Sequence, residues 1–160
     1  MINNVGVETF GITCCHMSDP PQPLIRPARP DDIDAVLDLA QVLAITFTLD
    51  HDTFESTFAT VIESQDAHLL VAELGGHVTG YLLGFEHPSF FANGPVAWVE
   101  EIAVTADYRR HTIGSSLMAA FENRVRDRDG RLIALATTRA SGFYESIGYT
   151  NHAAYFRKLL

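Results

Sequence analysis

The sequence is poor in cysteine and contains no long apolar run. Its only two cysteines, Cys14 and Cys15, are neighbours, and a disulfide between adjacent residues is strained. No Cys/His cluster accompanies them, so we expect neither a disulfide framework nor a metal site. No stretch approaches the ~20 apolar residues of a membrane-spanning helix, and the N-terminus lacks the layout of a secretory signal. These absences predict a cytoplasmic protein.

Basic residues are also scarce. The 11 Lys and Arg face 20 Asp and Glu, which gives a formal net charge of −9. This excess of negative charge disfavours broad contact with phosphate backbones or anionic membranes. We therefore expect neither nucleic acid nor a membrane as a partner. At 160 residues and 47% hydrophobic composition, the chain is long enough to bury one core.

The organisation of the chain changes near residue 24. Residues 1–23 show no sustained periodicity and end in the proline-rich stretch 20–23, which cannot continue a helix or a central strand. We expect a poorly ordered leader over 1–23. Residues 24–160 contain no linker, repeat or low-complexity block and are expected to form a single domain.

The first half of this domain predicts two helices. After a short extended run at 24–26, Asp31 or Asp32 can cap a helix whose apolar residues recur at i, i+3, i+4 and i+7 over 33–44. A weaker helical pattern covers 54–62, after a polar break. The segment between the two helices is a candidate substrate-facing loop.

A hairpin and a loop are predicted next. The apolar runs 67–74 and 77–85 are joined by Gly75 and Gly76, which is typical of a tight β-hairpin. Residues 86–95 contain two prolines and are expected to form a loop on the open side of the sheet.

The second half predicts a strand, a helix and a returning strand. Residues 96–104 are apolar except for Glu100 and Glu101, which should point to opposite faces because side chains alternate along a strand. A helix begins near Ile113 and stops before Gly130, so 96–136 forms a βαβ unit with parallel strands and a right-handed crossover.

The chain ends with two further predicted elements, a short helix around 143–146 and a strand over 153–160. The expected fold is therefore α/β around a mixed sheet, with an antiparallel N-terminal half and a central parallel βαβ unit. The apolar run 153–160 could pair inside the sheet or across a homodimer interface.

Two motifs flank the returning strand. The first, Arg109 to Ser115, lies where a strand gives way to a helix, and the first turn of a helix has unpaired N–H groups and partial positive charge. A diphosphate can bind there if small residues let it approach. A helix start with two solvated arginines is the alternative interpretation. The second motif reads Thr137-Thr138-Arg139-Ala140-Ser141-Gly142-Phe143-Tyr144-Glu145-Ser146-Ile147-Gly148-Tyr149.

Together these motifs resemble the GCN5-related N-acetyltransferase (GNAT) superfamily. Its acetyl-CoA signature is Gln/Arg-x-x-Gly-x-Gly/Ala, and here the stretch reads Arg109-Arg110-His111-Thr112-Ile113-Gly114. Its later signature is Asn-x-x-Ala-x-x-Phe-Tyr-x-x-x-Gly-Phe, which the second motif follows. Either motif alone is weak, but both in order are specific. The resemblance covers nearly all of 24–160 and implies a GNAT-like acyl-CoA N-acyltransferase fold with acetyl-CoA as co-substrate.

Two positions depart from the family pattern. Thr112 stands where the first Gly is usual, and its Cβ and branched side chain would lie beside the pyrophosphate. Thr137 stands where Asn is common, so a side-chain contact to the pantetheine arm would be only partly replaced. We expect reduced or altered affinity for acetyl-CoA, and not its loss.

The resemblance implies roles for three side chains. Amide formation needs an acceptor for the amine's proton, a polarised carbonyl and a proton for the leaving thiolate. The resemblance implies Glu100 as general base, acting through a water, and Tyr144 as general acid toward the leaving sulfur. Glu101 is the alternative base, or a group that attracts the cationic substrate. Without the resemblance, the two acids would belong to a solvent face and Tyr144 to the core.

Further residues are implied to bind the co-substrate. Those implied to hold the thioester and pantetheine through backbone N–H groups are Ile102, Ala103 and Val104, with Thr137 beside the arm. Those implied to grip the pyrophosphate are Arg109, Arg110, His111, Thr112, Ile113, Gly114 and Ser115.

The expected reaction is acetyl transfer from acetyl-CoA to the primary amine of a small molecule, or of a peptide or protein. The acids Asp50, Asp52, Glu55 and Glu86 lie in or beside the predicted loops and favour a cationic amine. One alternative keeps the fold and loses the reaction, leaving a domain that binds acyl-CoA or a partner as a sensor. Another is an unrelated α/β protein with a phosphate-binding turn.

Overall fold

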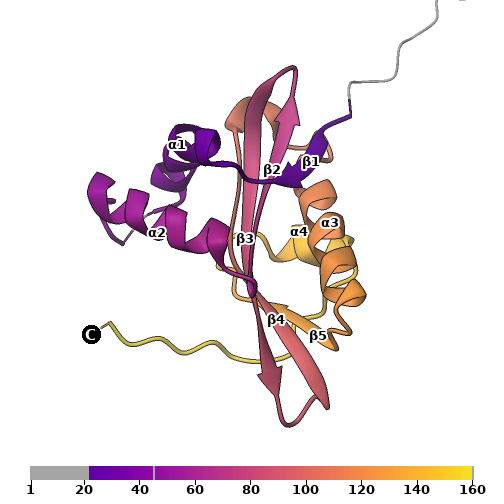
Figure 1. Ribbon diagram of the computed structural model, residues 1–160. Helices are drawn as coiled ribbons and strands as arrows, with labels where there is room; N and C mark the ends of the chain where they lie inside the picture. Colours follow the sequence, from indigo (N-terminus) through magenta and orange to yellow (C-terminus); the bar gives the residue numbers. More distant parts are fainter. Residues whose placement is uncertain (1–21, 45, 160) are drawn as a thin grey trace, which may run out of the picture.

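A five-stranded mixed sheet lies at the centre of the molecule (Figure 1). The computed structural model describes residues 22–44 and 46–159, so most of the predicted leader lies outside the described residues. The strands, in spatial and sequence order, are β1 (Leu24–Pro27), β2 (Ala67–Leu74), β3 (His77–Ser89), β4 (Gly94–Val104) and β5 (Leu132–Leu135). The first four pair antiparallel and β5 pairs parallel to β4, which confirms the predicted mixed α/β sheet.

Helices cover both faces of the sheet. On one face lie α1 (Ile33–Leu43) and α2 (His51–Glu63), and on the other lie α3 (Ile113–Asp127) and α4 (Ser141–Ser146) (Figure 1). Each side has its own apolar cluster, because side chains of a strand alternate between faces. Within the described part of the chain, no helix has both the length and the apolar content to cross a membrane.

The entry into α1 differs from the sequence prediction. A 3₁₀ turn, Pro30–Asp32, precedes the helix, and the Asp32 side chain makes no cap to α1. Its carboxylate instead accepts hydrogen bonds from the Arg26 guanidinium (2.7 and 2.9 Å) and from the backbone N–H of Arg29 (2.7 Å). The bond from Arg26 holds the Asp32 pKa below its usual value. The aspartate therefore ties β1 to the start of α1.

The second helix begins inside the predicted polar break. Asp50 is its N-cap, accepting a hydrogen bond from the backbone N–H of Thr53 (2.9 Å), and the helix starts at His51. The polar residues that suggested a break are thus a capping sequence.

The β2–β3 hairpin is confirmed, but the predicted loop after it is wrong. Gly75 and Gly76 have φ of 60° and 81°, as a two-residue turn requires. β3 then continues to Ser89 and pairs with β4 as far as Gly94. The two prolines that suggested a loop, Pro88 and Pro95, stand opposite each other near the end of this strand pair.

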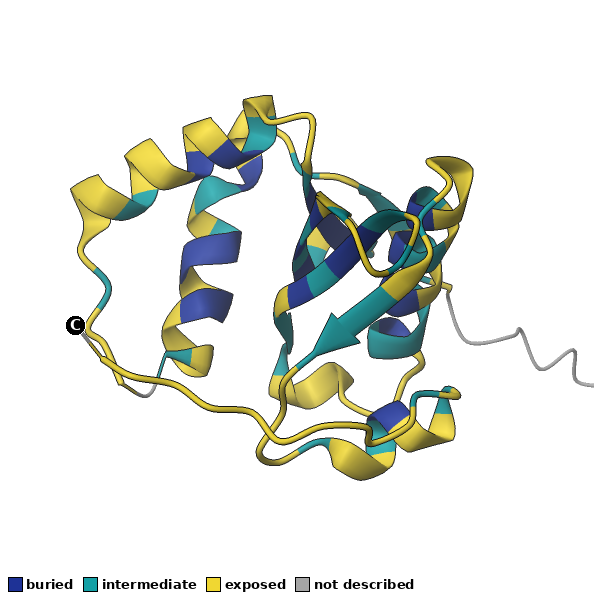
Figure 2. Ribbon diagram, turned by 90° about the horizontal axis from the view of Figure 1, so that it is seen from below, coloured by how far each residue is buried: buried dark blue, intermediate teal, exposed yellow. Residues whose placement is uncertain are grey.

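The predicted C-terminal strand is also absent. Residues 151–159 have no regular secondary structure and are exposed (Figure 2). They run from α4 past the sheet toward the side of α2 (Figure 1). Apolar composition suggested a strand, but a strand forms only where another strand supplies a hydrogen-bonding partner. The segment instead places Tyr155 against Trp98 of β4, with ring centroids 6.3 Å apart.

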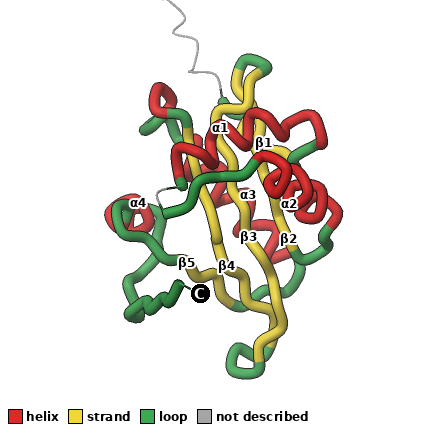
Figure 3. Tube along the Cα trace, turned by 90° about the vertical axis from the view of Figure 1, so that its left-hand side faces the viewer, coloured by secondary structure: helices red, strands yellow, loops and turns green. Residues whose placement is uncertain are grey.

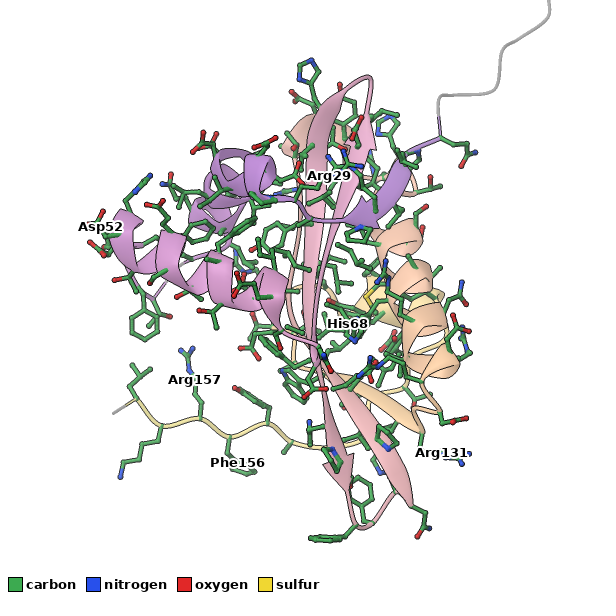
Figure 4. All side chains as sticks on the ribbon, in the orientation of Figure 1. Arg29, Asp52, His68, Arg131, Phe156 and Arg157 are labelled. Atoms are coloured by element: carbon green, nitrogen blue, oxygen red, sulfur yellow. The ribbon has the colours of Figure 1, made fainter. Side chains whose placement is uncertain are left out.

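A polar cluster links β2, β3 and the end of α3, with His68 and Glu86 buried and Arg128 exposed. The side chain of His68 is labelled in Figure 4. Its Nε2 lies 2.9 Å from a carboxylate oxygen of Glu86, and Arg128 Nε donates to the other oxygen at 2.8 Å. Glu86 therefore belongs to the core and not to an acceptor loop. Burial lowers the pKa of His68 below its usual 6.5 and outweighs the opposing attraction of Glu86.

This cluster predicts a loss of stability in acid. Below pH ~6.5, His68 takes up a proton in the unfolded chain but remains neutral in the folded protein, so the free energy of unfolding falls as pH falls. The loss ends once the pH passes below the folded-state pKa. Urea denaturation between pH 7.5 and 5.5 measures the free energy of unfolding. We expect it to depend less on pH in His68→Gln than in the exposed control His77→Gln. Equal slopes would contradict the prediction.

Candidate active site

The central strand β4 is irregular where its two acids lie. Leu83 of β3 stands opposite Glu101, but the next residue, Gly84, stands opposite Val99. Glu100 is therefore the extra residue of a β-bulge, a feature that bends a strand and re-aims its side chains.

At the same point β4 loses its neighbour on one edge. β5 pairs only with residues 96–99, whereas β4 continues to Val104 (Figure 3). Among the described residues, no strand pairs with this edge of β4 beyond Val99. An extended ligand can pair with such an open strand edge through main-chain hydrogen bonds.

The bulge also decides which face each side chain meets. Val99 and Ile102 both pack in the cluster on the α3 side, which strict alternation would forbid for residues three apart. Ala103 packs on the α1–α2 side, and Glu101 is hydrogen-bonded to Tyr81 of that side's cluster. The prediction that the two acids differ in orientation is consistent with this arrangement, and Glu100 is exposed while Glu101 is half-buried.

Glu101 has a partner that sequence reasoning missed. The Tyr81 hydroxyl donates to Glu101 Oε2 at 2.6 Å, and Tyr81 is only 1% exposed. Burial, followed by the nearby Glu101 charge, raises the Tyr81 pKa far above its usual 10. The available signal was a tyrosine inside an apolar strand, since a buried phenol needs a hydrogen-bond acceptor.

The start of α3 offers free backbone donors. Thr112 is the N-cap, but its hydroxyl donates back to the carbonyl of His111 (2.5 Å) and caps no helical N–H. The first turn carries no acidic residue, and Arg109, Arg110 and His111 are exposed beside it. A 15-residue helix with a basic, uncapped start is suited to binding an anion.

The backbone of this turn is strained at Thr112, whose φ is +62°. This left-handed conformation is unfavourable for a residue with a Cβ and worse for a β-branched one. The threonine therefore keeps a backbone geometry that favours glycine.

Thr112→Gly is expected to raise the free energy of unfolding by about 1 kcal/mol, because it removes the Cβ from a left-handed position. Thr112→Ala is the matched control: it retains the Cβ, so its free energy of unfolding should rise much less. Urea denaturation measures both. Titration with acetyl-CoA tests the predicted handicap in binding, which is wrong if the glycine variant binds no better than wild type.

Tyr144 lies in α4 on the α3 side of the sheet. It is 7% exposed and packs in the same cluster as Val99 and Ile113, with the rings of Phe143 and Tyr149 around it. Burial raises its pKa above 10, so the phenol is protonated at neutral pH. No hydrogen bond joins its hydroxyl to another residue in the described ranges, which leaves this proton available to a ligand.

Two small residues position α4. Gly114 in the first turn of α3 faces Phe143, and a Cβ there would lie 3.3 Å from the ring. Thr137 Oγ1 accepts hydrogen bonds from the backbone N–H groups of Ala140 (3.0 Å) and Arg139 (3.4 Å), closing the turn before α4. Its hydroxyl oxygen already accepts these local hydrogen bonds. A contact from Thr137 to a pantetheine arm, as predicted, would compete with them.

The structure brings several of the predicted site residues together. Ile102, Val104, Ile113 and Tyr144 share one cluster, and Ala103 lies on the opposite face of β4. Of the predicted acceptor-site acids, Asp50, Asp52 and Glu55 are exposed at the start of α2, where Asp52 points away from the sheet (Figure 4). Glu86 does not join them, because it is buried against His68 and Arg128.

The fold is thus a mixed α/β sheet in which an open strand edge precedes a basic helix start. A family model described as "Acetyltransferase (GNAT) family" matches residues 35–149, and the chain belongs to this family. The resemblance seen in the motifs is therefore confirmed, and the protein is an N-acetyltransferase of a family that uses acetyl-CoA as acyl donor.

Known proteins resemble the chain over most of its length. A Bacillus subtilis (strain 168) protein with the provisional name ribosomal protein bS18-alanine N-acetyltransferase is 27% identical over 128 residues, covering 78% of each chain. A provisionally assigned acetyltransferase from Agrobacterium tumefaciens str. C58 has a TM-score of 0.78 at 21% identity, covering 86% of this chain and 99% of its own. The ribosomal-protein-alanine N-acetyltransferase of Brucella melitensis biovar Abortus 2308 has a TM-score of 0.70 at 18% identity, covering 86% and 99%. At these identities, the structural matches show a shared fold.

Proposed function

We propose that the protein transfers the acetyl group of acetyl-CoA to a primary amine by direct attack. The observation that carries this proposal is the open edge of β4 beyond Val99, which the fold combines with an uncapped basic helix start and the protonated Tyr144. These features match the three parts of the donor: an extended arm, a diphosphate and a leaving thiolate.

The residues present fit acetyl-CoA. Backbone N–H groups of residues 102–104 would bind the thioester and the pantetheine arm, as strand edges bind extended ligands. The loop from Arg109 to Ser115 would bind the pyrophosphate through the first-turn amides of α3, and Arg109 and Arg110 add positive charge in an acidic protein.

The chain also supplies the proton transfers. Acetyl-CoA brings an activated thioester, whose carbonyl is polarised by backbone N–H groups of β4. A carboxylate on β4 accepts the proton of the amine: the family resemblance implies Glu100, with Glu101 as the alternative. Tyr144 donates its proton to the departing sulfur, and its raised pKa keeps that proton in place until the thiolate forms.

The acceptor is an amine of a small molecule or of a peptide or protein. Exposed acids at the start of α2, Asp50, Asp52 and Glu55, support a cationic acceptor. The name of the Bacillus subtilis relative adds one candidate acceptor, the N-terminal amine of a peptide or protein that begins with alanine.

Calorimetric titration with acetyl-CoA, CoA and ADP is the first test. We expect micromolar binding of acetyl-CoA and much weaker binding of ADP, which lacks the arm that β4 would bind. Arg109→Ala/Arg110→Ala should weaken acetyl-CoA binding, whereas Arg131→Ala, an exposed arginine beyond the end of α3, serves as control.

An amine panel then tests transfer. It should include polyamines, aminoglycosides, amino acids and peptides that begin with alanine, with CoA release as readout. Acetyl-CoA binding without transfer to any amine would favour the alternative of a non-catalytic acyl-CoA sensor. Equal binding of acetyl-CoA and ADP would indicate only a phosphate-binding turn.

A further inference from the structure

The two neighbouring acids of β4 have different surroundings. Glu100 is the extra residue of the bulge and is exposed, with no hydrogen bond or ion pair to another described residue. Glu101 is half-buried, and one of its oxygens accepts a 2.6 Å hydrogen bond from Tyr81. Only Glu101 is held in place by another side chain.

We propose that Glu101 is the general base and that Tyr81 is its positioning residue, which holds the carboxylate in a fixed orientation. The inference rests on the proposed acetyl transfer. It chooses Glu101 over Glu100 as the residue that accepts the proton of the amine.

Tyr81 is suited to this role because it cannot move easily. Its ring is 1% exposed and packs among apolar residues of α1, α2 and β2. The rigid ring therefore fixes the position of its hydroxyl, and the short bond fixes Glu101 Oε2. The other oxygen, Oε1, has no hydrogen-bond partner among the described residues and can accept a proton.

Tyr81 is the donor of this hydrogen bond. Burial raises the Tyr81 pKa, so the phenol keeps its proton and remains a donor at every working pH. Glu101 is the only charged group that acts on the Tyr81 hydroxyl in the described ranges, and the side chains packed around Tyr81 from α1, α2 and β2 are apolar. Glu100 is the adjacent charge on β4.

The proton balance of the step is then complete. The acceptor reacts as the neutral amine, after an ammonium has released one proton to solvent. Its nitrogen forms a bond to the acetyl carbon and the carbon–sulfur bond breaks. Glu101 Oε1 takes the proton that the nitrogen loses, and Tyr144 gives its own proton to the thiolate. Solvent returns a proton from Glu101 to Tyr144 after the products leave.

The test compares four variants with wild type: Tyr81→Phe, Glu101→Gln, Glu100→Gln and the double variant Tyr81→Phe/Glu101→Gln. Each is assayed for kcat/KM across pH with an amine found active in the panel. We expect Glu101→Gln to lower kcat/KM about 10²- to 10⁴-fold, the range for losing a general base, and Glu100→Gln to lower it far less.

Tyr81→Phe is expected to lower kcat/KM about tenfold across the profile, through kcat with KM near that of wild type, because the carboxylate loses the hydrogen bond that orients it. In the Glu101→Gln background the same change should add no further loss, since it acts only through Glu101. Tyr149→Phe is the matched control: this half-buried tyrosine donates to a different carboxylate, Glu122, at 3.2 Å. Its pH profile should match wild type.

Several outcomes would overturn the inference. An unchanged profile in Tyr81→Phe, an additional loss in the double variant, or a larger loss in Glu100→Gln than in Glu101→Gln would each do so while the proposed function stands. Wild-type protein that acetylates no amine would overturn the proposed function and this inference together.

Discussion

Tyr144→Phe is expected to lower kcat about 100-fold while leaving the affinity for acetyl-CoA close to that of wild type. The substitution removes only the hydroxyl, and the ring keeps its place in the cluster with Val99 and Ile113. Without that proton, CoA must depart as a thiolate or be protonated by water. Because burial raises the pKa of Tyr144, the wild-type phenol is a proton donor throughout the neutral range.

Steady-state kinetics and calorimetry separate the two effects. A loss in kcat with an unchanged dissociation constant identifies an interaction made in the transition state. Tyr149→Phe again serves as control, because its ring packs against Tyr144 while its hydroxyl bonds to Glu122. An unchanged kcat in Tyr144→Phe would remove the general-acid assignment.

Phe121→Ala is expected to cost about 3–5 kcal/mol of stability, the usual range for removing a buried aromatic ring. Phe121 is fully buried between α3 and the sheet, where its ring lies against Gly84 and meets the edge of His68. Total stabilities are about 5–15 kcal/mol, so this is a large share. The melting temperature should fall by roughly 6–20 °C.

A second substitution tests the same contact from the other side. A Cβ added at Gly84 would lie 2.5 Å from the Phe121 ring, so Gly84→Ala should destabilise by about 1–3 kcal/mol through overpacking. Gly142→Ala is the control, because no atom lies within 4 Å of its added Cβ. Combining Gly84→Ala with Phe121→Leu should cost less than the sum of the single changes. Strict additivity would contradict the proposed contact.

Much of the fold was predictable because local patterns and long-range packing agree. The apolar spacing from Ile33 onward and the Gly75-Gly76 turn each specify an element without reference to the rest of the chain. The βαβ order then requires β5 to lie parallel to β4. The basic turn at the start of α3 was predictable for the same reason, since its motif is contiguous.

The errors arose where a residue's partner lies far along the chain. Glu86 looked like a loop acid because its partners, His68 and Arg128, are distant in sequence. The apolar segment 151–159 looked like a strand, but no strand edge is paired with it. Composition describes what a segment could do, whereas pairing depends on which neighbours the fold provides.

The sequence by itself determined the family, the mixed sheet and the positions of the basic turn and of Tyr144, because these depend on short motifs and on periodicity. Only the tertiary structure decided that Glu100 is a bulge residue and that Glu101 is held by Tyr81. A bulge is a mismatch between two strands, and the Tyr81–Glu101 bond joins neighbouring strands across 20 residues of sequence. Neither exists until β3 and β4 pair in register.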